Sequence, residues 1–178
     1  MIKRIVAIGP ESTGKSTLSE LLAKHYQTHW VPEYAREYLL EHGTQYTMND
    51  LLTITNGQLN GEDKITRQAE AEGKKLLFVD TDMYVMKVWS EFVFNACDVR
   101  ILKEIAVRKY DLYLLCNADL PWIKDVLREY PDLATRQKLY HIYKDLMVNQ
   151  SVPWADISGN YEERFEKAVK AIDQLLIG

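Results

Sequence analysis

Residues 9–16 form a glycine-rich segment with the composition of a phosphate-binding loop. They read GPESTGKS and match the pattern G-x-x-x-x-G-K-[ST] at every fixed position. Glycines let successive backbone N–H groups turn toward phosphate oxygens, and a helix beginning near Lys15 would add its positive dipole end. We expect Lys15 to reach the β- and γ-phosphates of a nucleotide and the Ser16 hydroxyl to ligate Mg²⁺. The predicted nucleotide-binding residues are Gly9, Glu11, Ser12, Thr13, Gly14, Lys15, Ser16 and Thr17.

Two carboxylates follow a short apolar run at residues 76–79. Asp80 and Asp82 stand at the end of this expected strand, on the edge where parallel α/β sheets bind ligands. Asp80 is predicted to be the second Mg²⁺ ligand, directly or through a water molecule, and Asp82 to face a phosphoryl acceptor. The alternative for both is the ordinary cap of a helix that starts near Tyr84.

A third group of functional side chains lies in residues 31–37, VPEYARE, after the second expected strand. Either Glu33 or Asp82 is expected to orient a substrate hydroxyl, and Glu33 could accept its proton. Tyr34 would stack on an aromatic ring, and Arg36 would bind an anionic or carbonyl group. The alternative is a plain helix N-terminus with acids in its first turn and an arginine on the helix surface.

The segment 117–140 has the features of a lid that closes over phosphates. It follows the fourth expected strand and carries two prolines and two arginines, Arg128 and Arg136. Arginines on such a lid would stabilise charge on the transferring phosphoryl group while the closed lid excludes water. The alternative for each arginine is a solvated helix surface.

Short apolar runs alternate with longer helical patterns along the chain. Strands are expected at 5–8, 28–31, 76–79, 112–115 and 155–157. Helices are expected after the phosphate loop, from a Thr47 cap to about Glu72, and over 165–176. Gly57 and Gly61 allow a bend in the second of these helices. The alternation predicts right-handed crossovers and a parallel sheet between two helical layers, a three-layer α/β/α sandwich.

The composition limits the kinds of protein that this chain encodes. With 22 lysines and arginines and 26 aspartates and glutamates among 178 residues, the formal net charge is −4. The length fits one domain spanning 1–178, and the mild acidity gives no support for a nucleic-acid binder. Cys97 and Cys116 are far apart and lack metal-ligand spacing, which favours a reducing, cytoplasmic location. No apolar run approaches the roughly 18 residues of a membrane span, so no membrane association is expected.

Several classes of nucleotide-binding protein share such a phosphate loop. The segment after Asp80 lacks the glycine of the GTPase pattern D-x-x-G, and residues 117–119 lack the lysine of N-K-x-D. The Asp-Glu pair usual at the metal strand of large mechanochemical ATPases is also absent. A small-molecule kinase fits the remaining pattern best. A regulatory module that uses the nucleotide as a switch and has no acceptor is the other alternative.

Together these motifs resemble the NadR-type nicotinamide riboside kinase domain, which belongs to a small AAA-like family. The resemblance extends from Ile5 to the last helix and rests on GPESTGKS, EYARE at 33–37, Gln58, VDTD at 79–82, and Pro121-Trp122 with Arg128. It implies a five-stranded parallel sheet in the order 2-3-1-4-5 with a helical lid. It also implies ATP- and Mg²⁺-dependent phosphorylation of the 5′-hydroxyl of nicotinamide riboside, which gives nicotinamide mononucleotide.

Motifs and resemblance together give a set of predicted site residues. Those expected to take part in phosphoryl transfer are Lys15, Glu33, Asp82, Arg128 and Arg136. Those expected to bind the nucleoside substrate are Glu33, Tyr34, Arg36, Asp82 and Trp122. The metal ligands are Ser16 and Asp80. By analogy with nucleotide kinases, residues 158–160 are expected to contact the adenine base.

Two positions depart from the family pattern. Pro32 stands where bifunctional members typically carry a tryptophan, and Val126 replaces a lid glycine. The platform for the substrate ring would then come from Tyr34, Tyr84, Trp89 or Trp122. These departures leave the acceptor open: the resemblance implies nicotinamide riboside as the first choice, and another nucleoside or small metabolite is the alternative. Because bifunctional members carry further domains before the kinase and this chain starts just before its first expected strand, we expect a stand-alone kinase.

Overall fold

Five parallel strands form the centre of the computed structural model, which describes residues 1–177. Their order in the sheet is β2-β3-β1-β4-β5, as expected from the resemblance. The pairing register places Ala7 of β1 opposite Asp80 of β3, so the phosphate loop and the strand-end carboxylate emerge side by side. The strands are β1 (Lys3–Ile8), β2 (His29–Val31), β3 (Leu76–Asp80), β4 (Leu112–Cys116) and β5 (Trp154–Ile157).

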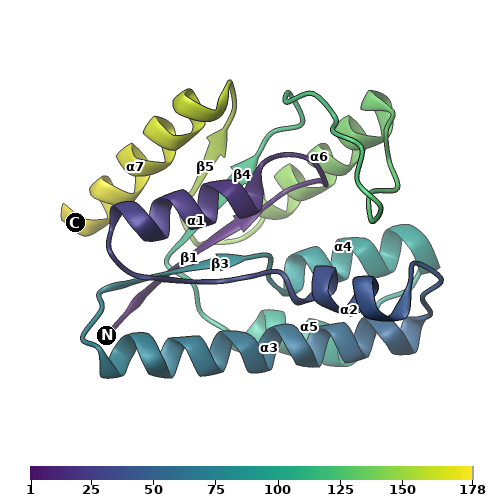
Figure 1. Cartoon of the computed structure of the whole chain (residues 1–178), viewed down its shortest axis with the longest axis horizontal. Coiled ribbons are helices and arrows are strands. Elements are labelled where there is room, and N and C mark those ends of the chain that lie inside the picture. Colours follow the sequence, from purple (N-terminus) through teal and green to yellow (C-terminus); the bar gives the residue numbers. More distant parts are fainter. Residues whose placement is uncertain (178) are drawn as a thin grey trace.

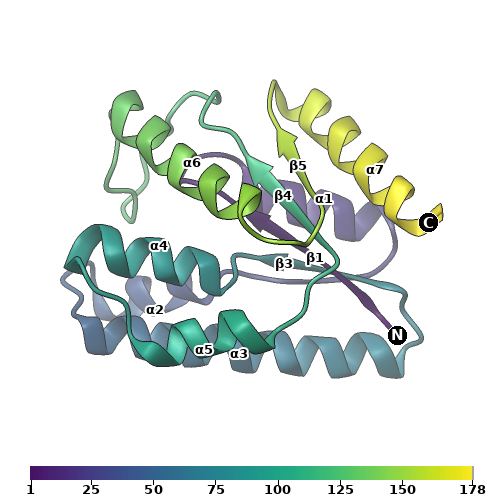
Figure 2. The ribbon, with the colours of Figure 1, turned by 180° about the vertical axis from the view of Figure 1, so that it is seen from behind.

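Helices cover both faces of this sheet (Figures 1 and 2). One face packs against α1 (Lys15–His25) and α7 (Tyr161–Ile177), which also contact each other. The opposite face packs against α3 (Met48–Ala71) and α6 (Leu133–Val148), and α4 (Met83–Phe94) lies against both of these helices. The outer helices are α2 (Tyr34–His42), which packs on α3, and α5 (Val99–Val107), which packs on α4.

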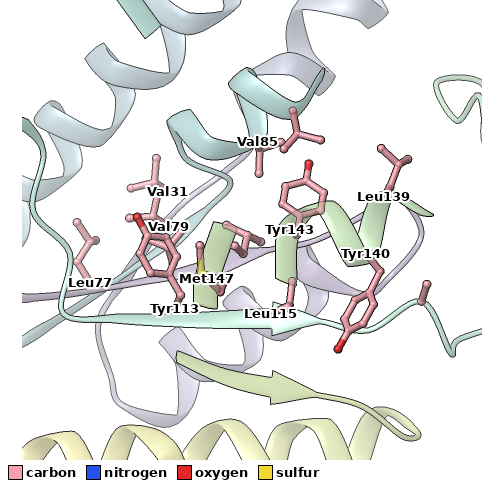
Figure 3. Close-up of a cluster of buried hydrophobic side chains, with 14 of the residues drawn as sticks. Val31, Leu77, Val79, Val85, Tyr113, Leu115, Leu139, Tyr140, Tyr143 and Met147 are labelled. Atoms are coloured by element: carbon pink, nitrogen blue, oxygen red, sulfur yellow. The ribbon is translucent and has the colours of Figure 1, made fainter. Parts of the chain in front are cut away.

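Each strand contributes apolar side chains to both faces, because successive residues point in opposite directions. Ile5 of β1 packs toward α1 and α7, whereas Val6 and Ile8 pack toward α6. Figure 3 shows this second cluster, in which Leu139, Tyr143 and other α6 side chains meet the strand residues. All five residues of β3 and of β4 are buried, as expected for strands covered on both faces.

The helices agree with the sequence pattern in part. The expected cap at Thr47 is confirmed as a capping box with Asp50, and α3 runs without a break to Ala71 despite its two glycines. We predicted no element for the segment that forms α5. Within the expected lid, only the part from Leu133 is helical, because Pro121 and Pro131 disfavour helix in the segment before it. None of the helices in residues 1–177 has the length and apolar content needed to cross a bilayer.

Candidate active site

The phosphate loop connects β1 to α1 and has the backbone conformation that its glycines predict. Gly9 has φ of +135°, and a Cβ at this position would lie 2.5 Å from the carbonyl oxygen of Cys116. Only glycine fits such a close approach. The loop is braced from within, because the Thr13 hydroxyl and the Lys15 ammonium donate to the Pro10 carbonyl at 2.7 and 2.8 Å. Lys15 therefore lies along the loop, with its charge at the rim of the cavity described below.

Ser16 and Asp80 lie together at the point where a metal ion is expected. The Ser16 hydroxyl donates to Oδ2 of Asp80, while the buried Oδ1 of Asp80 has no hydrogen-bond partner among residues 1–177. Burial, with the Glu33 carboxylate as a second cause, holds the pKa of Asp80 well above its ordinary value, and Lys15 opposes this shift. A carboxylate oxygen beside a hydroxyl offers the oxygen ligands that a hard cation prefers. The two residues therefore fit Mg²⁺, which would also reverse the pKa shift.

Asp82 has a structural role in this arrangement. Its Oδ1 accepts from the backbone N–H of Tyr84 and of Val85 and caps α4, and its Oδ2 accepts from the Tyr113 hydroxyl at 2.9 Å. Burial raises the pKa of Asp82 to about 7, although the Tyr113 hydrogen bond acts in the opposite direction. Asp82 does not line the cavity. These contacts thus agree with the alternative noted from the sequence, in which Asp82 caps the helix that begins near Tyr84.

Residues 33–37, the predicted acceptor-side block, form the beginning of α2 beside the end of β3. Glu33 and Arg36 line the cavity, whereas Tyr34 turns its ring toward Gly57 of α3. The backbone N–H of Tyr34 donates to Oε1 of Gln58 at 2.8 Å. Nε2 of Gln58 in turn donates to the carbonyls of Asp80 and Thr81 at 3.2 and 3.1 Å. A single buried amide therefore fixes the acceptor-side block against the metal side of the site.

A cavity of about 250 Å³ joins these parts. One end is formed by the phosphate loop and by Tyr161, and Glu33, Arg36 and Arg128 lie along its walls. The other end is aromatic and aliphatic, and its lining residues are Leu39, Tyr46, Val85, Val88, Trp89, Phe92, Leu127, Tyr130, Leu139 and Tyr143. The cavity thus offers an anion-binding end and an end suited to a flat apolar group.

The lid segment closes over this cavity and contacts three other parts of the protein. Glu11 of the phosphate loop accepts the indole N–H of Trp122, so Trp122 contacts the loop rather than the aromatic end. Arg36 pairs with Asp125 of the lid at 2.9 Å. On the aromatic side, the Trp89 indole N–H donates to the Tyr46 hydroxyl, which donates to Glu129, in each case at 2.9 Å.

The two lid arginines differ in position. Arg128 lines the cavity and donates to the Ile123 carbonyl within the lid. Arg136 is buried in α6, where it donates to the Leu120 carbonyl at 3.2 Å, and it does not line the cavity. Of the pair, Arg128 is thus the one that faces the predicted phosphate site.

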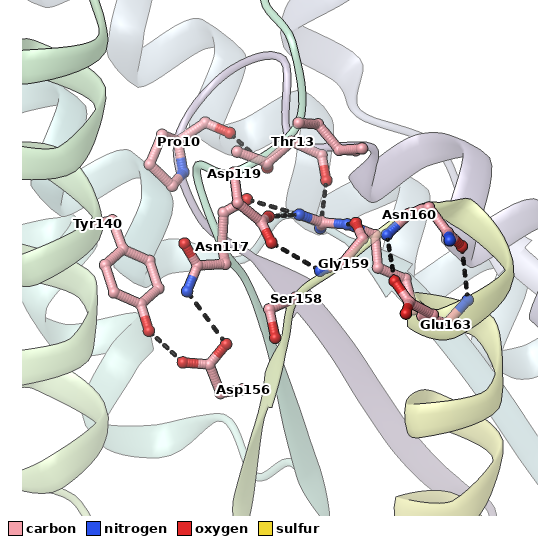
Figure 4. Close-up of polar contacts among 12 residues, drawn as sticks. Pro10, Thr13, Asn117, Asp119, Tyr140, Asp156, Ser158, Gly159, Asn160 and Glu163 are labelled. Atoms are coloured by element: carbon pink, nitrogen blue, oxygen red, sulfur yellow. Dashed lines mark hydrogen bonds and ion pairs between the residues drawn. The ribbon is translucent and has the colours of Figure 1, made fainter.

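A buried arginine connects the phosphate loop to the segments that follow β4 and β5. Arg164 of α7 donates to the carbonyls of Thr13 and Gly159 at 3.0 and 2.7 Å, and also to the carbonyl of Asn117. It forms an ion pair with Asp119, whose second oxygen accepts the Gly159 N–H (Figure 4). Residues 158–160, the expected base-contacting segment, are therefore held beside the loop. Tyr161, which follows them, lines the cavity.

The structure brings most of the predicted residues to one place. The cavity lining includes the whole loop from Gly9 to Thr17 together with Glu33, Arg36 and Arg128. Five predicted site residues lie outside the lining: Tyr34, Asp80, Asp82, Trp122 and Arg136. The aromatic end was missed apart from Trp89. Its signal in the sequence is the helical spacing of Trp89 and Phe92 after the strand-end carboxylates.

The sheet order, the loop and the strand-end carboxylate define a P-loop nucleotide-binding protein with a kinase-type α/β fold. A family model described as "AAA domain" (AAA_28) matches residues 4–164, so the chain belongs to this AAA family.

Two curated relatives match nearly the whole chain. Both are the trifunctional NAD biosynthesis/regulator protein NadR, from Salmonella typhimurium (22% identical over 182 residues) and from Escherichia coli (23% over 180 residues). Each alignment covers 98% of this chain and 43% of the relative, so the chain spans less than half of their length.

Solved structures show the same fold. NadR in complex with NR superposes with a TM-score of 0.76 at 21% identity over 98% of this chain and 51% of the other. NadR in complex with NAD and AMP-PNP superposes with a TM-score of 0.75 at 23% identity, over 98% of this chain and 49% of the other. Deoxyadenosine kinase from M. mycoides with bound dATP superposes with a TM-score of 0.63 at 14% identity, over 96% of this chain and 99% of the other. At these identities the likeness establishes the fold alone.

Proposed function

We propose that the protein is an ATP- and Mg²⁺-dependent kinase that phosphorylates the primary 5′-hydroxyl of a nucleoside, with nicotinamide riboside as the first acceptor. The observation that carries this proposal is the continuous cavity from the phosphate loop, past Glu33 and Arg36, to the aromatic end. A triphosphate fits the first part, a sugar hydroxyl the second and a flat ring the third. The relatives described as NadR act in NAD biosynthesis, and one related structure holds NR.

The donor side has the groups that phosphoryl transfer requires. The loop N–H groups and Lys15 would bind the β- and γ-phosphates of ATP. Ser16 and Asp80 would hold Mg²⁺, which neutralises charge on the phosphates when it is bound. Arg128 lines the same cavity and would stabilise negative charge on the transferring group. Related structures contain AMP-PNP and dATP, which supports a nucleotide at this end.

The acceptor side would position the alcohol for in-line attack. The hydroxyl oxygen forms a bond to the γ-phosphorus, the bond from this phosphorus to its bridging oxygen breaks, and ADP leaves. The hydroxyl proton passes to the Glu33 carboxylate, which lines the cavity. Arg36 is fixed by Asp125 and would bind a polar group of the acceptor. Trp89, Phe92 and Tyr130 provide the ring contacts that a tryptophan at position 32 would otherwise supply.

An acceptor panel tests this function. Purified protein is incubated with Mg²⁺-ATP and one acceptor at a time: nicotinamide riboside, the common purine and pyrimidine nucleosides, or no acceptor. ADP formation and the phosphorylated product are both measured. We expect nicotinamide riboside to give the highest kcat/KM. Turnover of another nucleoside with none on nicotinamide riboside would reject this substrate, and slow hydrolysis indifferent to every acceptor would favour the nucleotide-switch alternative.

Loss of the loop lysine shows whether the turnover comes from this site. Lys15→Ala is expected to weaken nucleotide binding and to lower kcat by about 10²-fold or more, because a cation that stabilises transition-state charge is removed. Lys24→Ala, which removes an exposed lysine from the end of the same helix, is the matched control. Near-normal turnover of Lys15→Ala would reject the assignment of the site.

A further inference from the structure

Glu11 is the only acidic side chain in the phosphate loop, and its hydrogen bonds within residues 1–177 all connect the loop to the lid. Its Oε1 accepts the indole N–H of Trp122 at 3.2 Å and the backbone N–H of Tyr130 at 2.7 Å. Its Oε2 accepts the backbone N–H of Glu129 at 2.9 Å. Three donors from one short segment thus converge on one carboxylate.

These donors lie on both sides of Arg128 in the sequence. Trp122 precedes Arg128 by six residues, whereas Glu129 and Tyr130 follow it directly. Because Glu11 holds both ends of this segment, it determines where the segment lies above the loop. A neighbouring loop hydroxyl adds one contact, since Ser12 Oγ accepts the backbone N–H of Ile123 at 3.1 Å.

The Glu11 carboxylate places a negative charge in a loop that is expected to bind phosphates. Its charge repels the γ-phosphate unless other donors hold and neutralise it. The lid supplies these donors only when it lies over the loop. Occupation of the loop by a triphosphate and closure of the lid would therefore favour each other.

We propose that Glu11 is a positioning residue that holds the lid closed over the phosphate loop and so places Arg128 at the transferring phosphoryl group. Glu11 makes no contact with the reacting atoms in this scheme and acts through the lid. The closed lid is a property of the free protein, whereas its effect on phosphoryl transfer rests on the proposed kinase function.

Hydrogen exchange of the free protein tests the first part without any turnover. In Glu11→Ala, the backbone amides of Glu129 and Tyr130 are expected to exchange about tenfold faster or more, because hydrogen bonds to a charged acceptor are lost. Amides of β1 should keep their protection, which shows that the variant is folded. Glu20→Gln, an exposed acid on α1, is the matched control. Unchanged exchange at Glu129 and Tyr130 in a folded Glu11→Ala protein would overturn the proposal.

Kinetics separate positioning from damage to the loop. Glu11→Gln is expected to lower kcat about tenfold or more, while the Kd for Mg²⁺-ATP stays the same or decreases, since a negative charge leaves the loop. Glu11→Asp, which keeps the charge, should restore part of kcat. A rise in the Kd as large as the fall in kcat would contradict the positioning role. If the unmodified protein phosphorylates no acceptor, the exchange result still decides whether Glu11 holds the lid.

Discussion

The ring of Tyr34 fills the space in which a side chain at Gly57 would begin. A Cβ built on Gly57 would lie 2.1 Å from two atoms of that ring, whereas a Cβ on Gly61, one helical turn further along α3, would meet nothing within 4 Å. A side chain would therefore clash at position 57 of this helix, whereas position 61 has room for one. At Gly57 the reason is the close packing of α2 on α3, with the Tyr34 ring against the glycine.

This contrast predicts opposite effects of alanine at the two positions. Gly61→Ala is expected to stabilise the protein by about 0.5–1 kcal/mol, because alanine favours the helix more than glycine. Gly57→Ala is expected to destabilise it, because overpacking of about 1–3 kcal/mol exceeds that gain. Gly57→Ala should also raise the KM for the acceptor without changing the Kd for ATP, since Tyr34 follows Glu33 directly. Thermal unfolding and steady-state kinetics measure both effects, and equal stability of the two variants would contradict the packing argument.

Exchange of a carboxylate for an amide distinguishes the roles of Glu33 and Asp82. Glu33 lines the cavity, so Glu33→Gln is expected to lower kcat by about 10²-fold or more with little change in stability. Asp82 caps α4, and Asn is also a good cap, so Asp82→Asn should affect kcat far less. Steady-state kinetics with ATP and the preferred acceptor measure the difference. A larger loss of kcat in Asp82→Asn would show that Asp82 rather than Glu33 orients the hydroxyl.

Removal of the same carboxylate without an amide replacement should instead affect stability. Asp82→Ala removes the α4 cap and leaves the buried Tyr113 hydroxyl without its acceptor. The expected cost is about 1 kcal/mol for the cap and about 1–3 kcal/mol for the hydroxyl. Urea unfolding of Asp82→Ala and of the double variant with Tyr113→Phe measures these contributions. If the second substitution recovers none of the loss, the hydrogen bond contributes less than we expect.

The Arg164 contacts predict a link between stability and nucleotide binding. Arg164→Met keeps the aliphatic stem but leaves three carbonyls and Asp119 without their buried donor, at a cost of roughly 3 kcal/mol. Because one of these carbonyls belongs to Thr13, the Kd for ATP should also rise. Lys170→Met, an exposed lysine of the same helix, is the control. Unaltered urea unfolding of Arg164→Met would show that the network contributes little.

The capping box of α3 predicts a pH-dependent contribution to stability. Hydrogen bonds from Thr47, followed by one from Tyr38, lower the pKa of Asp50 to about 2 in the folded protein. A carboxylate with a lowered pKa stabilises the fold fully above its unfolded value of about 3.8, and this contribution is lost as the pH falls toward 2. Asp50→Asn should therefore lower Tm at pH 7, and the difference from the unmodified protein should shrink between pH 4 and pH 3. Glu70→Gln, an exposed acid on α3, should show no such dependence.

Features that depend on neighbours in the sequence could be predicted directly. The phosphate loop, the buried strands and the Thr47 cap each follow from a short run of residues. The same is true of Asp80, whose place at the end of an apolar run put it beside the loop. The strand order could not be predicted from such short runs. It was expected only because several motifs resemble those of a known family.

Features that depend on distant contacts could not be predicted in this way. Glu11 meets donors 111 to 119 residues away, and nothing near it in the sequence indicates a lid contact. Gly57 was expected only to weaken α3, since its packing partner Tyr34 lies on another helix. Asp82 could cap a helix or face a substrate, and the choice depended on Tyr113 of another strand.

The Gln58 amide limits which parts of the site can adapt. It bonds the first residue of α2 to Asp80, the last residue of β3, and to Thr81, which follows it. A shift of α2 or of this strand end would therefore break a buried hydrogen bond. Divergence toward a new acceptor would therefore arise at the far aromatic residues, such as Trp89 and Phe92, where a change of shape leaves this amide intact. Chains of similar fold can in this way share one geometry for delivering phosphate while they differ in the molecule that receives it.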